Sequence, residues 1–333
     1  MRSLSYVQAK TLREAIEAYA AAGEGARYIA GGTTLYDLMK LGVERPAHLV
    51  DIASLEGADR IDTSGDVLFF GAGALMADVA ENDVVRRDYP VLAESLSKAA
   101  SQQLRNMATV GGNLLQRTRC PYFRNGAIGV YPCNKREPGS GCAAIGGLDR
   151  GQAVLGISDA CTAVSPGDWP VALAAMDATI ELQGPTGTRS IPISEFYLLP
   201  GETPHLEFAI GRGEIVTGIS VPKTVAGRNS TYLKVRDRES YAFALASAAV
   251  ALAMDGDHVR QAHIALGGVA TRPWRAREAE DFLKGRYIGP EIALAAGRAA
   301  FADARAGEHN AFKIELGART LADAIMTAGR KMQ

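Results

Sequence analysis

A glycine- and proline-rich segment in the middle of the chain carries every cysteine, and it constrains the fold more than any other feature. Cys120, Cys133, Cys142 and Cys161 fall within 42 of the 333 residues, in a stretch that begins CPYFRNGAIGVYPCNKREPGSGC. The stretch lacks the apolar periodicity of a core helix or strand. A long segment of this kind inside a compact protein needs something other than burial to hold it. Four thiols on such a segment indicate a metal centre.

The spacing of the cysteines favours an iron–sulfur cluster over zinc. The intervals contain 12, 8 and 18 residues, whereas structural zinc sites usually contain ligand pairs separated by two to four residues. Iron–sulfur clusters are held by four thiolates and accept irregular spacings. Basic residues at positions 117, 119, 124, 135 and 136 would offset a cluster's negative charge. The alternative is four unconnected thiols, because cysteine often serves as a small buried apolar residue.

Composition narrows the class of protein. The chain is 47% apolar and 22% charged, as in ordinary globular proteins. A net charge of −1 without a long basic run argues against nucleic-acid binding. The chain contains no run of about 20 apolar residues, so we expect no membrane span. The first residues also lack the layout of a secretory signal. The five histidines show neither metal-ligand spacing nor a hydrolase pattern.

Apolar periodicity and the positions of capping, glycine and proline residues predict a mixture of helices and strands along the chain. The composition changes near Pro222. Thr11 and Glu14 form a capping-box pattern before a helix that Gly23 closes. Other elements expected in the first part are strands at 27–30, 48–52, 67–71 and 179–183 and helices at 35–42, within 78–100 and at 170–178. In the last part we expect strands at 231–238 and 261–270, an alanine-rich helix at 242–254, a helix at 273–285 and two more helices. Residues 234–241 are typical of a solvated edge strand.

Two glycine pairs with polar neighbours are candidate ligand loops. One pair is Gly31-Gly32, followed by two threonines, and the other is Gly111-Gly112, between Thr109 and Asn113. Glycine permits positive φ angles and close approach of a ligand to the backbone. Two such loops favour a ligand with several polar anchors, such as a dinucleotide, and two tight turns explain them equally well. The GAGALM stretch after residue 70 departs from the dinucleotide-binding fingerprint, and we reject it as a nicotinamide site.

Five segments together resemble the flavoprotein (medium) subunit of the xanthine oxidase family of molybdenum hydroxylases. They are YIAGGTTLYDLMKLG, QLRNMATVGGNLLQ, SPGDWPVALAAMDA, VTGISVP and KVRDRESYAFALASAAVAL. They occur in family order over nearly the whole chain. The cysteine-bearing insert is similar to the FAD/4Fe-4S subunit of bacterial three-subunit aldehyde oxidoreductases. Ser165 departs from that subgroup, where His is common.

The resemblance implies FAD and a 4Fe-4S cluster as cofactors. The residues that it implies for FAD are Ala30, Gly31, Gly32, Thr33, Thr34, Leu35, Tyr36, Asp37, Leu38, Thr109, Gly111, Gly112, Asn113, Asp168, Val216 and Lys234. The cluster ligands would be Cys120, Cys133, Cys142 and Cys161. No catalytic residue is implied on this chain, because substrate oxidation would occur on a partner subunit.

The implied fold is α+β, with a two-part FAD-binding domain of the vanillyl-alcohol-oxidase/PCMH type and a smaller C-terminal domain of antiparallel sheet and helices. The domains would span 1–222, with an iron–sulfur loop at 117–162, and 228–333. The implied function is electron transfer in a heterotrimeric aldehyde oxidoreductase, from 2Fe-2S clusters of a small subunit, through FAD, to an external acceptor. A large subunit would hold the molybdopterin cofactor.

Two other functions stay open: a zinc-stabilised interaction module and a stand-alone FAD oxidoreductase. The compartment expected by default is the cytoplasm, and export with a signal-bearing partner would place the complex in the periplasm.

Overall fold

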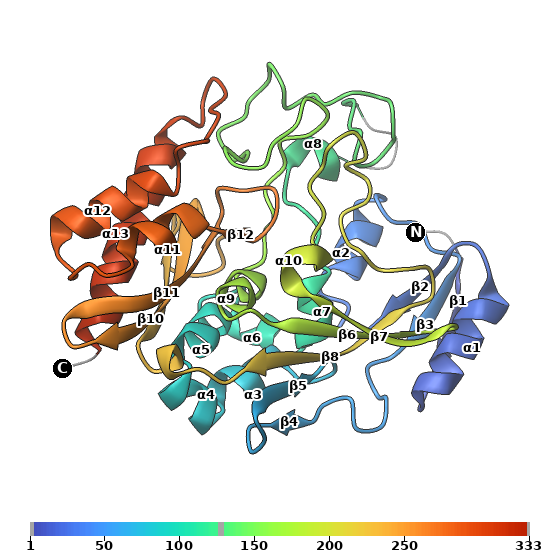
Figure 1. Cartoon of the computed structure of the whole chain (residues 1–333). Coiled ribbons are helices and arrows are strands. Elements are labelled where there is room, and N and C mark those ends of the chain that lie inside the picture. The colour runs from blue at the N-terminus through green and yellow to red at the C-terminus, as the bar shows by residue number, and fades with distance from the viewer. Residues whose placement is uncertain (1–2, 126–129, 332–333) are drawn as a thin grey trace.

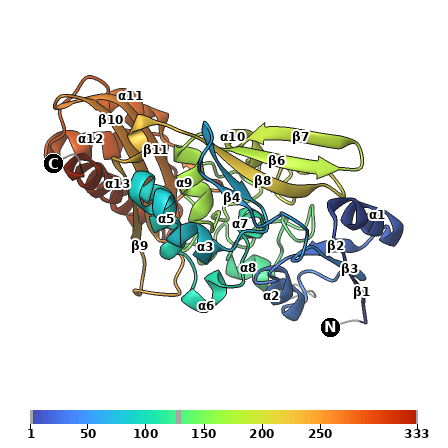
Figure 2. The same cartoon turned by 90° about the horizontal axis from the view of Figure 1, so that it is seen from below.

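Three sheets organise the chain in the computed structural model, which describes residues 3–125 and 130–331. Their strand orders are β1-β3-β2, β4-β5-β8-β6-β7 and β12-β11-β10-β9. The five-stranded sheet lies between the other two, as Figure 2 shows. Positions 1–2 and 332–333, at the ends of the expected domains, and positions 126–129, within the expected iron–sulfur loop, lie outside the described residues. Among the described residues, no helix has the length and apolar character needed to cross a membrane.

The N-terminal sheet is parallel and carries one side of the candidate site. Strands β1 (Ser5–Gln8) and β2 (Ala26–Ile29) flank β3 (His48–Asp51). Helix α1 (Leu12–Ala22) connects the first two strands. It begins as predicted, because the Thr11 side chain accepts a hydrogen bond from the Glu14 N–H and the Glu14 carboxylate accepts one from Thr11. The short helix α2 (Leu35–Lys40) follows β2.

The five-stranded sheet is antiparallel and packs on helices that come from between its strands. The strands are β4 (Ile61–Asp62), β5 (Val67–Gly71), β6 (Thr179–Gly184), β7 (Gly187–Pro192) and β8 (Ile215–Pro222). The helices are α3 (Met76–Glu81), α4 (Asp83–Asp88), α5 (Pro90–Ser97), α6 (Gln102–Arg105), α7 (Val110–Leu114), α9 (Trp169–Ala175) and α10 (Ile193–Phe196).

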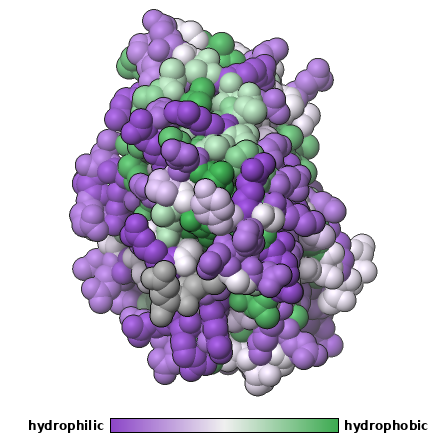
Figure 3. Space-filling model, turned by 60° about the vertical axis from the view of Figure 1, so that its left-hand side comes forward, coloured by the Kyte–Doolittle hydropathy of each residue, from purple (hydrophilic) through white to green (hydrophobic). Residues whose placement is uncertain are grey.

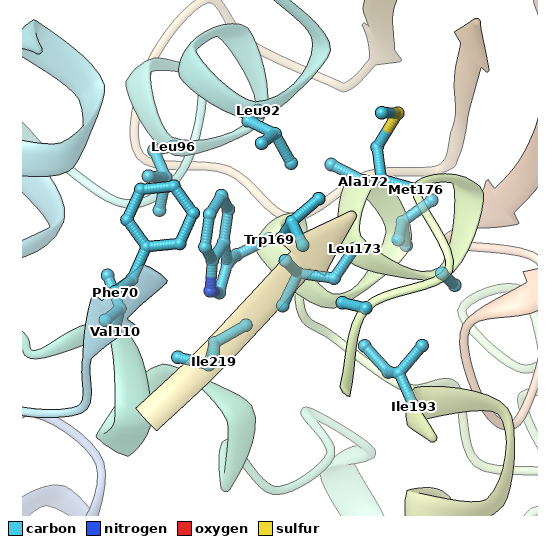
Figure 4. Close-up of a cluster of buried hydrophobic side chains, with 14 of the residues drawn as sticks. Phe70, Leu92, Leu96, Val110, Trp169, Ala172, Leu173, Met176, Ile193 and Ile219 are labelled. Carbon is cyan, nitrogen blue, oxygen red and sulfur yellow. The ribbon is translucent and has the colours of Figure 1, made fainter. Parts of the chain in front are cut away.

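Trp169 is the centre of this core. It is fully buried and meets Phe70 edge-to-face, with ring centroids 5.6 Å apart. Leu92 and Leu96 of α5 and Ile219 of β8 belong to the same cluster (Figure 4). Edge-to-face aromatic pairs add specificity to the burial energy. The core therefore joins the N-terminal helices to strands that lie more than 100 residues later.

The C-terminal sheet contains the element whose type the sequence predicted wrongly. Residues 246–255 form strand β10 (Ala246–Asp255), where an alanine-rich helix was expected. Its neighbours are β9 (Ser230–Val235) and β11 (His258–Gly267), and β12 (Trp274–Arg275) extends the sheet. Helices α11 (Arg277–Leu283), α12 (Pro290–Ala299) and α13 (Phe312–Arg330) complete this region, and a 3-10 turn (Val225–Gly227) precedes it.

Packing on both faces explains why β10 is a strand despite its alanines. Ala249, Ala251 and Ala253 belong to the core around Trp169, whereas Ala248 and Val250 belong to a second core beneath α11–α13. Alanine has high helix propensity, but tertiary packing overrides it. Small side chains allow helices to approach a central strand closely from either side.

The cysteine-bearing insert, which we define as residues 117–162, has little regular structure in its described part. It contains the helix α8 (Pro121–Arg124) and short bridges such as Cys133 with Cys142. In Figure 1 it lies at the top of the view, between the C-terminal helices and α2.

The predicted α+β fold class is confirmed for the chain. On the face seen in Figure 3, hydrophilic side chains predominate, with smaller apolar areas between them.

Candidate functional site

A cleft of about 410 Å³ opens between the N-terminal sheet and the five-stranded sheet. Its walls come mainly from the stretches 27–35, 55–58, 109–112 and 214–217, with further residues from other parts of the chain. This volume lies in the range of ligand pockets in proteins. The lining is mostly apolar, with backbone amides and a few charged groups at its edges. The cleft is therefore suited to a large, partly aromatic ligand.

The first glycine loop is shaped by close backbone contacts. A Cβ atom on Gly31 would lie 1.8 Å from the carbonyl oxygen of Met107, so no other residue fits there without moving the backbone. Gly32 has a φ of +70°, which disfavours other residues. The chain then enters α2, and Thr33 and Thr34 face the cleft.

The second glycine loop forms another part of the cleft wall. The Thr109 hydroxyl accepts a hydrogen bond from the Gly112 N–H at 3.1 Å and thereby caps α7. A Cβ atom on Gly111 would lie 2.6 Å from the Cβ of Ala72. Ala72 itself lines the cleft, although its GAGALM stretch was rejected as a nicotinamide site. The two glycine loops, far apart in sequence, thus face one cleft.

Asp168 and Lys234 form a buried ion pair. The Lys234 Nζ lies 2.7 Å from Asp168 Oδ2, and the two side chains are only 1% and 6% exposed. The Tyr232 hydroxyl donates to the other carboxylate oxygen at 2.7 Å. Burial raises the pKa of Asp168, and the Lys234 ammonium opposes that rise. The pair joins the start of α9 to strand β9.

The structure brings together most of the predicted FAD residues, but not all of them. Those that line the cleft are Ala30, Gly31, Gly32, Thr33, Thr34, Leu35, Leu38, Thr109, Gly111, Gly112 and Val216. Those outside its lining are Tyr36, Asp37, Asn113, Asp168 and Lys234. Asn113 points into the core, where its amide donates to the Met76 sulfur at 3.3 Å.

Several cleft residues were not anticipated from the sequence. Leu55 and Ala58 follow β3, and Glu44 precedes it. The segments that follow the parallel strands β2 and β3 leave the sheet at the same edge, and this signal could have indicated Leu55 and Ala58. Arg117 also lines the cleft; the sequence indicated it only as a basic neighbour of the cysteines.

The four cysteines line one small cavity in the insert. All are free thiols, and Cys133 and Cys161 are buried. Burial raises the pKa of Cys161 to about 11, and the nearby Lys135 ammonium opposes this rise. Burial also raises the pKa of Cys120, whose sulfur accepts a hydrogen bond from Gln152 Nε2 at 3.4 Å. In the part of the chain that the structure describes, no group of three or more His, Cys, Asp or Glu side chains is arranged to hold a metal ion.

The chain belongs to the family described as FAD binding domain in molybdopterin dehydrogenase, which matches residues 2–224. Residues 231–328 match the family described as CO dehydrogenase flavoprotein C-terminal domain. Together these matches define a flavoprotein (medium) subunit of the xanthine oxidase family, a class of oxidoreductases, as the sequence predicted. The implied two-part FAD-binding fold with a smaller C-terminal domain is confirmed.

Individual relatives agree with this assignment. The chain is 46% identical to the aldehyde oxidoreductase FAD-binding subunit PaoB of Escherichia coli (strain K12), over 98% of this chain and 99% of that protein. It is 28% identical to the glyceraldehyde dehydrogenase medium chain of Sulfolobus acidocaldarius, over 86% and 83% of the two chains. A solved chain of carbon monoxide dehydrogenase from Hydrogenophaga pseudoflava superposes with a TM-score of 0.77 at 25% identity, covering 99% of this chain and 98% of that one.

Proposed function

We propose that the chain is the FAD- and 4Fe-4S-binding electron-transfer subunit of a heterotrimeric, molybdenum-dependent aldehyde oxidoreductase. The observation that carries this proposal is the convergence of all four cysteines on one cavity beside a flavoprotein cleft. The full-length similarity to the PaoB subunit supports aldehydes as the substrate class. FAD would accept electrons from 2Fe-2S clusters of a small partner subunit and release them to an external acceptor.

The residues around the cleft fit FAD. Gly31 and Gly111 pack so closely against neighbouring backbone that each loop presents its amides without intervening side chains. Apolar residues such as Leu38 and Val216 supply surface for an aromatic ring system. We propose the cleft-lining residues of the implied set as direct FAD contacts. Asp168 and Lys234 lie outside the cleft lining, and we propose that they support it as a fixed, charge-balanced pair.

We infer a cluster rather than a single zinc ion from the four thiols around the cysteine cavity. One tetrahedral zinc ion with Zn–S bonds of about 2.3 Å holds its sulfurs about 3.8 Å apart. The described residues offer no such compact group. A 4Fe-4S cluster is larger and is held by four thiolates, which is the donor set around this cavity. Lys135 lines the cavity and would offset part of the cluster's negative charge.

Metal and flavin analysis of anaerobically purified protein tests the proposal. We expect about one FAD and about four irons with equal sulfide per chain, by the four-thiolate rule for such clusters, and a matching absorption and EPR spectrum. Zinc in a colourless protein would instead support the interaction module. Turnover of an aldehyde by the chain alone would support the stand-alone oxidoreductase.

A pair of variants assigns the iron to the cavity. C133S should lose iron and sulfide, because it removes one buried thiol from the cavity. E137Q is a matched control, since Glu137 is exposed in the same insert. Full iron content in C133S would exclude Cys133 as a ligand.

A further inference from the structure

Helix α2 is too short to hold its own shape. It spans six residues, and Thr34 at its start makes no side-chain capping bond. Helices shorter than about 12 residues are marginal in water unless other elements pack on them. The loop before α2 and its first residue line the cleft, as does Leu38, the fourth residue of the helix. The shape of this wall therefore depends on whatever supports α2.

Two arginines of the insert bind the carboxylate of α2. Arg119 Nη1 lies 2.9 Å from Asp37 Oδ2, and Arg124 pairs with the same oxygen. Arg124 lies on α8, directly after Cys120. Its side chain is only 14% exposed, so solvent screens this contact less than it screens a surface pair. The insert thus holds α2 from outside the cleft.

An apolar contact joins the same two elements. Leu38, Phe123 and Cys133 form one buried cluster, with Cys120 packed against it. Leu38 also lines the cleft, whereas Phe123 and Cys133 also line the cysteine cavity. A single cluster of side chains therefore borders both sites.

A chain of ion pairs makes a second connection. Arg117 binds Glu44 and Glu207, each at 2.6 Å, and Glu207 binds Lys135 at 3.1 Å. Glu44 and Arg117 line the cleft, and Lys135 lines the cysteine cavity. Alternating charges link the two sites without an interruption.

We propose that the insert is the support of helix α2, with Arg119 and Arg124 as positioning residues, so that order in the insert sets the affinity for FAD. This inference rests on the proposed function, in which a centre held by the four cysteines orders the insert. The described part of the insert has one four-residue helix, so it gains little order from secondary structure. Such coupling is reciprocal, and bound FAD stabilises the insert in return.

The test is a double-mutant cycle on FAD binding to the full-length chain after flavin removal. Flavin fluorescence gives the Kd of wild type, C133S, R119M/R124M and the variant that combines all three changes. We expect C133S and R119M/R124M each to raise the Kd at least about fivefold, the lower range of coupling between sites. The combined variant should add less than about twofold to the effect of R119M/R124M. R119K/R124K, which keeps the charges, should restore most of the affinity.

R150M is the matched control. Arg150 lies in the same insert, and its side chain is 58% exposed and pairs with Asp237 away from α2. We expect its FAD Kd to equal that of wild type. If R119M/R124M does not fold, D37N breaks the same link from the side of α2 and replaces it in the cycle.

Iron assays on the same samples separate the two proposals. C133S that loses iron but binds FAD like wild type would overturn the coupling and leave the cluster standing. If the Kd of the combined variant rises by the product of the factors measured for C133S and R119M/R124M, the role of the arginines would be overturned. A wild-type chain without iron would overturn the proposed cluster, and an unchanged Kd in R119M/R124M would then overturn the support of α2 as well.

Discussion

Replacing Lys234 by methionine leaves the Asp168 carboxylate in the core without its counter-charge. Both side chains are nearly inaccessible to water, and their charged atoms lie 2.7 Å apart. Removal of one partner from a buried ion pair costs about 3–5 kcal/mol of unfolding free energy. The Tyr232 hydroxyl still donates to Asp168, so we expect a loss near the lower limit, about 3 kcal/mol. Methionine preserves most of the buried volume.

Urea unfolding at pH 7, monitored by far-UV circular dichroism, measures this loss. The double variant D168N/K234M carries no buried charge at this place, and it should recover to within about 1 kcal/mol of wild type. The control is R228M, which breaks an exposed pair with Asp88, and it should cost less than about 1 kcal/mol. Equal losses in K234M and R228M, or no recovery in the double variant, would refute the buried-pair reasoning.

Two further changes test other parts of the structure. Burial lowers the pKa of Lys313 from 10.5 to about 8, so between these values the unfolded chain binds more protons and stability increases as pH rises. Relative to K313M, the unfolding free energy of wild type should increase by about 3 kcal/mol from pH 8 to pH 10.5, and parallel pH curves for the two proteins would contradict this. G31A should lower FAD content severalfold, because its Cβ meets the Met107 carbonyl, whereas G65A, whose Cβ would have its nearest neighbour at 4.0 Å, should retain FAD. Equal flavin absorbance in both purified proteins would argue against the Gly31 contact.

Local patterns predicted the N-terminal part well. The capping box at Thr11 and the strand at 67–71 appear as expected, because their signals lie within a few residues of each other. Both glycine loops line the cleft, and the tight packing of Gly31 and Gly111 explains why glycine stands at these positions; their contact with FAD stays a prediction.

Long-range packing accounts for what the sequence did not predict. Strand β10 is rich in the best helix-forming residue, and only burial on both faces makes it a strand. Residues 234–241 were expected to form a solvated edge strand, and β9 is an edge strand but ends at Val235. Lys234 is buried rather than solvated, because it forms an ion pair with Asp168, 66 residues earlier in the chain. The ligands of the cysteine cavity and the role of Lys234 toward FAD stay predictions.

Strand β10 also limits how the molecule can move. One face belongs to the core around Trp169 and the other to the core beneath the C-terminal helices. A hinge between the two regions would have to separate alanines from helices on one face and expose apolar surface at a cost of about 25 cal/mol per Å². The core around Trp169 and the core beneath the C-terminal helices therefore move together as one rigid body. The cleft lies at the N-terminal sheet, which packs through a separate apolar cluster, so the constraint that β10 imposes does not extend to the N-terminal wall of the cleft.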